Sequence, residues 1–124
     1  MVQISQLKSR QVFDSRGFPT IETDVILTDG SVGSSIVPSG ASTGTHEAHE
    51  LRDQNKAYLN KSVFNAVENV NTKINKALKN EDPFDQDKID NILIELDGTK
   101  NKSNLGTNSI LSVSIANCKA VAKS

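Results

Sequence analysis

The sequence predicts an α+β domain in which a three-stranded antiparallel meander is followed by a helical bundle. Two observations lead to this class. Residues 1–37 alternate polar and apolar side chains in runs separated by turn residues, as short antiparallel strands do. After residue 62, apolar side chains recur at helical spacing instead. At 124 residues the chain has the size of a single domain, which we assign to residues 1–124.

The first expected strand covers residues 3–13. Its expected inward side chains are Ile4, Leu7 and Val12, although their alternation with polar residues is imperfect. Residues 14–19 (DSRGFP) predict a turn, because glycine permits left-handed backbone and proline cannot donate a ladder hydrogen bond.

A second strand is expected over residues 20–28, where apolar and polar side chains alternate and leave one wet face. Asp29 and Gly30 favour a tight hairpin turn. The chain then returns as a third strand over residues 31–37, and Pro38 ends the pairing.

Three helices are expected in the second half. The first presents an apolar face formed by Val63, Val67, Val70, Ile74 and Leu78. The second presents Ile89, Ile92, Leu93 and Leu96. For this second helix we expect Asp85 as the N-cap and Gly98 as the stop.

The last helix is expected to begin at Asn104 or Asn108 and to continue to Ala122. It is apolar nearly all round, which predicts burial on several sides beneath a larger partner. Cys118 lies on this apolar helix and is expected to pack in the core.

Composition excludes several function classes. The net charge of −1 provides no basic field for nucleic acid or an anionic membrane. A single cysteine excludes an internal disulfide and a multi-cysteine zinc site. The start lacks the apolar core of a signal peptide, and no apolar run reaches membrane-spanning length. We therefore expect a soluble cytoplasmic protein.

The most informative stretch is VPSGASTGTHEAHELRD at residues 37–53. Its small and hydroxylated residues can bring backbone groups and hydroxyls to a phosphate or a hard cation. Ionisable side chains follow directly, which a plain flexible linker does not need. The lysine of a phosphate-binding P-loop is absent. His46, His49 and Glu50 would share a helix face in passable metal-ligand geometry, or form a solvated surface.

Four blocks of the sequence resemble the N-terminal domain of enolase, in the same order and spacing. They are VFDSRGFPTIE at residues 12–22, the stretch at 37–53, AVENVN at 66–71 and IELDGTKNKSNLGTNSILSVSIA at 94–116. Departures from the family pattern occur at Phe18, Thr45, His49, Thr107 and Ser109.

The resemblance implies an enzyme that dehydrates 2-phosphoglycerate to phosphoenolpyruvate with Mg²⁺, whose base, acid and metal carboxylates lie on a (β/α)₈ barrel absent from these residues. It implies a mobile lid formed by Ser39, Gly40, Ala41, Ser42, Thr43, Gly44, Thr45 and His46. Within this lid, Ser42 matches a ligand of the second Mg²⁺, and Gly40, Ala41, Ser42 and His46 match positions beside the substrate.

The same resemblance implies at least a homodimer, with Arg10 and Glu22 at positions that form cross-subunit ion pairs. The resemblance also implies a cytoplasmic location, with members of the family sometimes found at the cell surface or secreted as well. We expect residues 1–124 alone to be inactive. The alternative is a stand-alone, non-catalytic binding domain that reuses the same fold.

Overall fold

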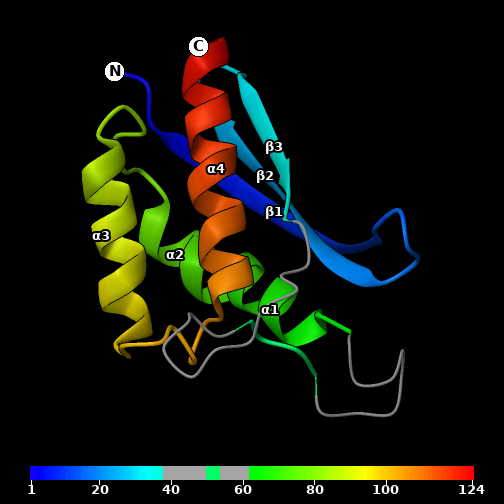
Figure 1. Ribbon diagram of the computed structural model, residues 1–124. Helices are drawn as coiled ribbons and strands as arrows, with labels where there is room; N and C mark the ends of the chain where they lie inside the picture. Colours follow the sequence, from blue (N-terminus) through cyan, green and yellow to red (C-terminus); the bar gives the residue numbers. More distant parts are fainter. Residues whose placement is uncertain (38–49, 54–61) are drawn as a thin grey trace.

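The computed structural model describes residues 1–37, 50–53 and 62–124. Three strands, β1 (Ile4–Phe13), β2 (Pro19–Leu27) and β3 (Val32–Ile36), pair antiparallel in the order β1-β2-β3. The helical segments that follow are α1 (Phe64–Asn69), η2 (Val70–Ile74), α2 (Asn75–Leu78), α3 (Gln86–Asp97) and α4 (Thr107–Lys123). Helix α4 packs on β2 and β3, and the α1–α2 stretch lies along β1 (Figure 1). The expected α+β class is therefore confirmed.

A β-bulge explains the imperfect alternation in β1. The register with β2 shifts between Ile4 and Gln6, so Ile4 and Leu7 are both buried although they are three residues apart. In a regular strand, residues at that spacing face opposite sides of the sheet. The expectation for Val12 was wrong, because it stands five positions after Leu7, faces the other side and is only half-buried.

Side-chain amides from the helical half close the outer edge of β1. Asn75 Oδ1 accepts from the Leu7 amide at 2.8 Å, and Asn71 Oδ1 accepts from the Ser9 amide at 2.8 Å. Asn71 Nδ2 also donates to the Ser9 carbonyl at 3.1 Å. Four helical residues advance about 6 Å and two strand residues advance about 6.8 Å, so successive helical turns meet alternate residues of the strand.

The helix expected from Val63 to Leu78 contains a π turn, η2, that the apolar spacing does not reveal. At this turn the Thr72 hydroxyl donates to the Glu68 carbonyl at 2.7 Å and occupies the acceptor of an α-helical bond. The expected apolar face is otherwise confirmed: Val63, Val70, Ile74 and Leu78 are buried, and Val67 packs against them half-buried.

Helix α4 approaches the sheet so closely that β3 has room only for a glycine there. A Cβ atom on Gly33 would lie 2.1 Å from the Ala116 carbonyl oxygen and 2.2 Å from the Ala120 nitrogen. A buried contact between the Ser112 and Thr23 hydroxyls, at 2.8 Å, joins α4 to the neighbouring strand β2. The sheet-facing side of α4 is therefore a stripe of small residues, namely Ser109, Ser112, Ala116 and Ala120.

Three expectations about the helices need correction. Helix α4 begins after Gly106, and neither Asn104 nor Asn108 caps it. Cys118 is exposed, because the stripe of small residues, and not the thiol, faces the sheet. Leu96, expected in the apolar face of α3, is 39% exposed.

The expected caps of α3 are confirmed. Asp85 accepts a hydrogen bond from the Lys88 amide at 3.1 Å, and Gly98 ends the helix in a left-handed conformation with φ 74°.

Buried Asp97 organises the connection from α3 to α4. Its carboxylate accepts from the Leu105 amide at 2.7 Å, from the Thr99 amide at 3.0 Å and from the Thr99 hydroxyl. Burial by itself raises the pKa of Asp97, but the Leu105 amide and both Thr99 donors together bring it below its ordinary value. The connection therefore depends on an ionised carboxylate.

We expect Asp97→Asn to lower the free energy of unfolding by about 2 kcal/mol at pH 7, because an amide cannot accept all of these bonds. The folded-state pKa is lowered, so the contribution of Asp97 is complete above its unfolded value near 3.8 and is lost as the pH falls below that value. Urea unfolding at neutral and acid pH should show the two proteins converging in acid. Glu95→Gln, at an exposed site on α3, is the control; an equal difference at both pH values would contradict this account.

Candidate functional site

The residues expected to form the lid, 39–46, lie outside the described residues, as does His49. The structure instead describes what stands on either side of them. Before them is Val37, the residue directly after β3. After them comes a short stretch, residues 50–53, which we call the anchor segment.

Val37 is fixed to β2 through both of its backbone groups. Its amide donates to the Ile21 carbonyl at 3.1 Å, and its carbonyl accepts from the Thr20 hydroxyl. Val37 and Thr20 are both buried. The chain therefore leaves the sheet at Val37 from a position held by two hydrogen bonds and by apolar packing.

The anchor segment is held by a side chain from the first turn of α4. Asn108 Oδ1 accepts from the Leu51 amide at 3.0 Å, and Asn108 Nδ2 donates to the Leu51 carbonyl at 3.1 Å. The amide thus pairs with Leu51 as a neighbouring strand would. Asn108 is buried, with 3% of its surface exposed.

Gly106 makes this contact sterically possible. It precedes α4 with φ 90°, a conformation that residues with a side chain rarely adopt. A Cβ atom here would lie 2.4 Å from Leu51 Cβ and 2.6 Å from Asn108 Oδ1. The chain therefore needs glycine at this position for both conformation and space.

Arg52 ties the anchor segment back to the sheet. One of its guanidinium nitrogens donates to the Pro19 carbonyl at 2.5 Å, and another lies 3.4 Å from the Glu50 carboxylate. Pro19 is the neighbour of Thr20 in β2, and Thr20 holds Val37. The two sides of residues 38–49 are therefore attached to consecutive residues of one strand.

Asp53 connects the anchor segment to the start of α1. Its carboxylate accepts from the Phe64 amide at 2.9 Å, the Asn65 amide at 3.0 Å and the Ser62 hydroxyl at 2.6 Å. The Asp53 amide donates in turn to the Ser62 carbonyl at 2.9 Å. A buried carboxylate at a helix N-terminus satisfies free amides and interacts favourably with the helix dipole.

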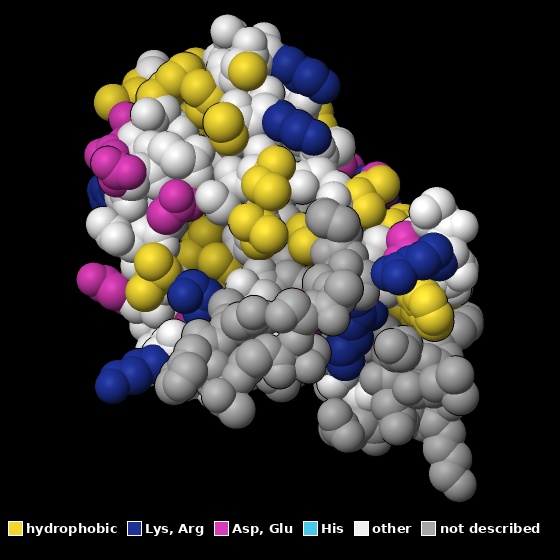
Figure 2. All heavy atoms as spheres, in the orientation of Figure 1, with side chains coloured by type: hydrophobic (Ala, Val, Ile, Leu, Met, Phe, Trp, Pro, Cys, Tyr) yellow, Lys and Arg dark blue, Asp and Glu magenta, His cyan; other side chains and the backbone are white. Residues whose placement is uncertain are grey.

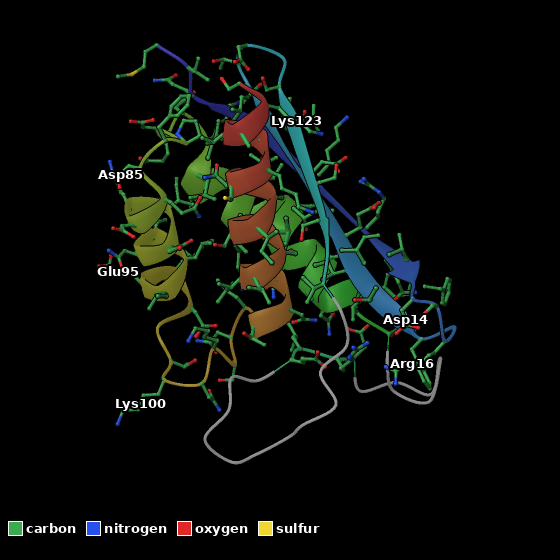
Figure 3. The ribbon with its side chains drawn as sticks, turned by 45° about the horizontal axis from the view of Figure 1, so that its top comes forward. Asp14, Arg16, Asp85, Glu95, Lys100 and Lys123 are labelled. Carbon is green, nitrogen blue, oxygen red and sulfur yellow. The ribbon has the colours of Figure 1, made fainter. Side chains whose placement is uncertain are left out.

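The turn between β1 and β2 is held by Asp14, whose side chain accepts from the Arg16 and Phe18 amides at 2.9 Å each. The Phe18 amide lowers the pKa of Asp14, and the Arg16 amide acts in the same direction. Asp14 and Arg16 lie together at the end of the sheet far from Lys123 (Figure 3). This turn leads directly into Pro19 and so helps to place the Pro19 carbonyl, which accepts from Arg52.

Charged side chains form ion pairs on the side of the sheet away from the helices. Arg10 lies 2.7 Å from the Glu22 carboxylate, its register partner on β2, and 2.7 Å from the Asp24 carboxylate. Ser34 on β3 donates to Asp24 at 2.5 Å. Arg10 and Glu22, expected at a subunit interface, are therefore paired with each other within this chain.

No described part of the chain gathers three or more His, Cys, Asp or Glu side chains into a group that could hold a metal ion. Nor does any helix in the described ranges have the length and apolar character needed to cross a membrane. An open, mostly apolar groove of about 210 Å³ lies between α3 and α4. Ile94 and Leu111 line it, and Figure 2 shows hydrophobic side chains on this face of the molecule.

Sequence reasoning did not assign the anchoring roles of Thr20, Asp53 and Asn108. Asp53 was grouped with the ionisable residues of its stretch, and Asn108 was considered only as a helix start. The glycine at 106 is the one local signal that could have pointed to a close contact at the start of α4.

Comparison with known proteins places these observations in a family. Residues 4–124 match the family model described as the N-terminal domain of enolase. Enolase 1 of Lactococcus lactis subsp. cremoris is 56% identical over 123 residues, covering 99% of this chain and 29% of that protein.

Two further relatives agree. Enolase of Corynebacterium kroppenstedtii is 54% identical over 124 residues, covering 100% of this chain and 29% of that protein. Enolase 2 of Lactiplantibacillus plantarum is 57% identical over 119 residues, covering 96% of this chain and 28% of that protein. The chain thus spans less than a third of the length of these curated relatives.

Proposed function

The chain belongs to the family of enolase N-terminal domains, and on this premise we propose that it is the first domain of a longer, Mg²⁺-dependent lyase that dehydrates 2-phosphoglycerate to phosphoenolpyruvate in glycolysis. The catalytic base, acid and metal carboxylates then belong to the barrel beyond this domain. The observation that carries the proposal is the match over residues 4–124, with identities of 54–57% to enolases that are much longer.

We assign the contribution of this domain to residues 39–46. In this proposal Ser42 supplies oxygen ligands to Mg²⁺, a cation that prefers such donors. Gly40, Ala41 and His46 lie beside the phosphorylated substrate. Anchors on both sides of these residues support the assignment, because a segment that covers and uncovers a site needs fixed ends to return to.

The chemistry explains why such a segment is useful. Removal of a proton beside a carboxylate builds negative charge, which bound Mg²⁺ neutralises. The residues of this domain would orient the substrate and exclude water, and they would not transfer the proton themselves.

We also propose that the longer protein is at least a homodimer and that the ion-paired side of the sheet is part of its interface. Arg10 is 43% exposed while paired with Glu22 and Asp24, so it remains accessible to a carboxylate of a second subunit. A single exposed pair stabilises little, whereas a network of several charges fixes register and orientation. A cytoplasmic location and a small phosphorylated substrate, with no nucleic-acid partner, complete the proposal.

Residues 1–124 alone are expected to give no turnover and only weak Mg²⁺ binding, because one serine holds a hard cation poorly. Calorimetric titration with Mg²⁺ and a phosphorylated hydroxy acid, run beside the longer protein, checks this. Tight binding by residues 1–124 alone would instead support a non-catalytic binding domain.

In the longer protein, Ser42→Ala is expected to lower kcat about tenfold to hundredfold and to raise the Mg²⁺ concentration needed for half-maximal activity, because the segment and cation are no longer aligned. Steady-state kinetics across a Mg²⁺ series measures both quantities. Lys100→Ala, at an exposed position in the connection between α3 and α4, should behave as the unmodified protein. An unaltered Mg²⁺ dependence in Ser42→Ala would remove Ser42 from the metal site.

Arg10→Ala is expected to weaken dimerisation of the longer protein about fivefold to hundredfold, because it leaves Glu22 and Asp24 without their cation at the proposed interface. Sedimentation equilibrium gives the dimer dissociation constant. Lys88→Ala removes an exposed ion pair with Glu81, 3.1 Å long, from α3 and is the matched control. Equal dissociation constants for the two variants would place the interface elsewhere.

A further inference from the structure

We infer that Thr20 and Asn108 are positioning residues for the proposed active-site segment, residues 39–46, because they hold Val37 before it and Leu51 after it. This inference rests on the proposed function, because it gives the two residues a part in that reaction. Neither residue lies within residues 38–49, and neither touches the substrate in our account.

Thr20 controls the end at Val37. The Val37 amide is already bonded to the Ile21 carbonyl, and the Thr20 hydroxyl fixes the remaining backbone group of Val37. Thr20 is 2% exposed, so water is largely excluded from this bond. A change at Thr20 therefore alters the direction in which the chain leaves the sheet while the rest of β2 stays paired.

Asn108 controls the other end. It bonds both backbone groups of Leu51 and belongs to the first turn of α4, the helix that packs on the sheet at Gly33. Gly106 allows the start of α4 to lie close to Leu51 at this point. The anchor segment is thereby attached to the helix that packs closely on the sheet at Gly33.

The attachments of Val37 and of the anchor segment meet at neighbouring residues of β2. Arg52, next to Leu51, donates to the carbonyl of Pro19, and Pro19 is adjacent to Thr20. Loss of either attachment should shift one end of the segment relative to the other. Displacements near 1 Å in groups that align a reaction reduce rates about a hundredfold, so this shift should appear in catalysis.

The test compares matched variants in the longer protein. Thr20→Val removes the hydroxyl and keeps the shape, and Thr20→Ser restores the hydroxyl. Thr23→Val is its control, because Thr23 is a buried threonine of the same strand whose hydroxyl contacts the Ser9 and Ser112 hydroxyls.

Asn108→Ala is compared with Asn117→Ala. Asn117 is also buried in α4 and also donates to a backbone carbonyl of another segment, that of Pro83, at 3.0 Å. Both variants should lower the unfolding temperature, so that a loss of stability alone does not distinguish them.

Two readouts separate positioning from stability. Hydrogen exchange, followed by mass spectrometry of the peptide covering residues 37–53, needs no activity and should speed up about tenfold in Thr20→Val and Asn108→Ala. In the same variants kcat should fall about tenfold or more and the Mg²⁺ half-saturation should rise. Thr20→Ser should show the exchange rate and the kinetics of the unmodified protein. The controls Thr23→Val and Asn117→Ala should leave both readouts unchanged.

The inference is wrong if Thr20→Val and Asn108→Ala differ from their controls in neither readout. A longer protein that exchanges as expected but does not dehydrate 2-phosphoglycerate would contradict the proposed function and leave the anchoring intact. An active protein that responds to Ser42→Ala but not to these variants would overturn only the inference.

Discussion

The close contact between α4 and the sheet at Gly33 is the constraint on which the rest of the domain depends. Two helix residues, Ala116 and Ala120, occupy the space that a side chain on β3 would need. Because the helix is rigid, this contact also fixes its first turn, where Asn108 reaches Leu51. The contact at Gly33 and the attachment of Leu51 are therefore made by one helix, α4.

Sequence patterns predicted the elements better than their irregularities. Alternation placed β2 correctly because burial keeps period two from Ile21 to Leu27, although Thr23 is polar and Ile26 is apolar. In β1 the bulge reverses the facing of residues after Ile4, so Val12 was assigned to the wrong side. The π turn was missed because the apolar residues keep helical spacing through it. Cys118 was misplaced because hydropathy favours burying a thiol over a serine, whereas the close contact with the sheet requires small residues.

The candidate site was predictable only in part. Composition and the resemblance selected residues 39–46, whereas the residues that hold their flanks act across long sequence separations. Asn108 is 57 positions from Leu51, and no local pattern links the two. The ion pair between Arg10 and Glu22 within the chain was likewise not predicted. It follows from their facing positions in the β1–β2 register, which a family pattern by itself does not contain.

The closed edge of β1 has a consequence for the behaviour of the molecule in a crowded cell. A foreign strand can add to a sheet only where amides and carbonyls are vacant. Along β1 the Leu7 and Ser9 amides are taken by asparagine side chains, and both backbone groups of Ile4 pair with residues 80–81. Asn71 and Asn75 therefore protect this border against templated aggregation.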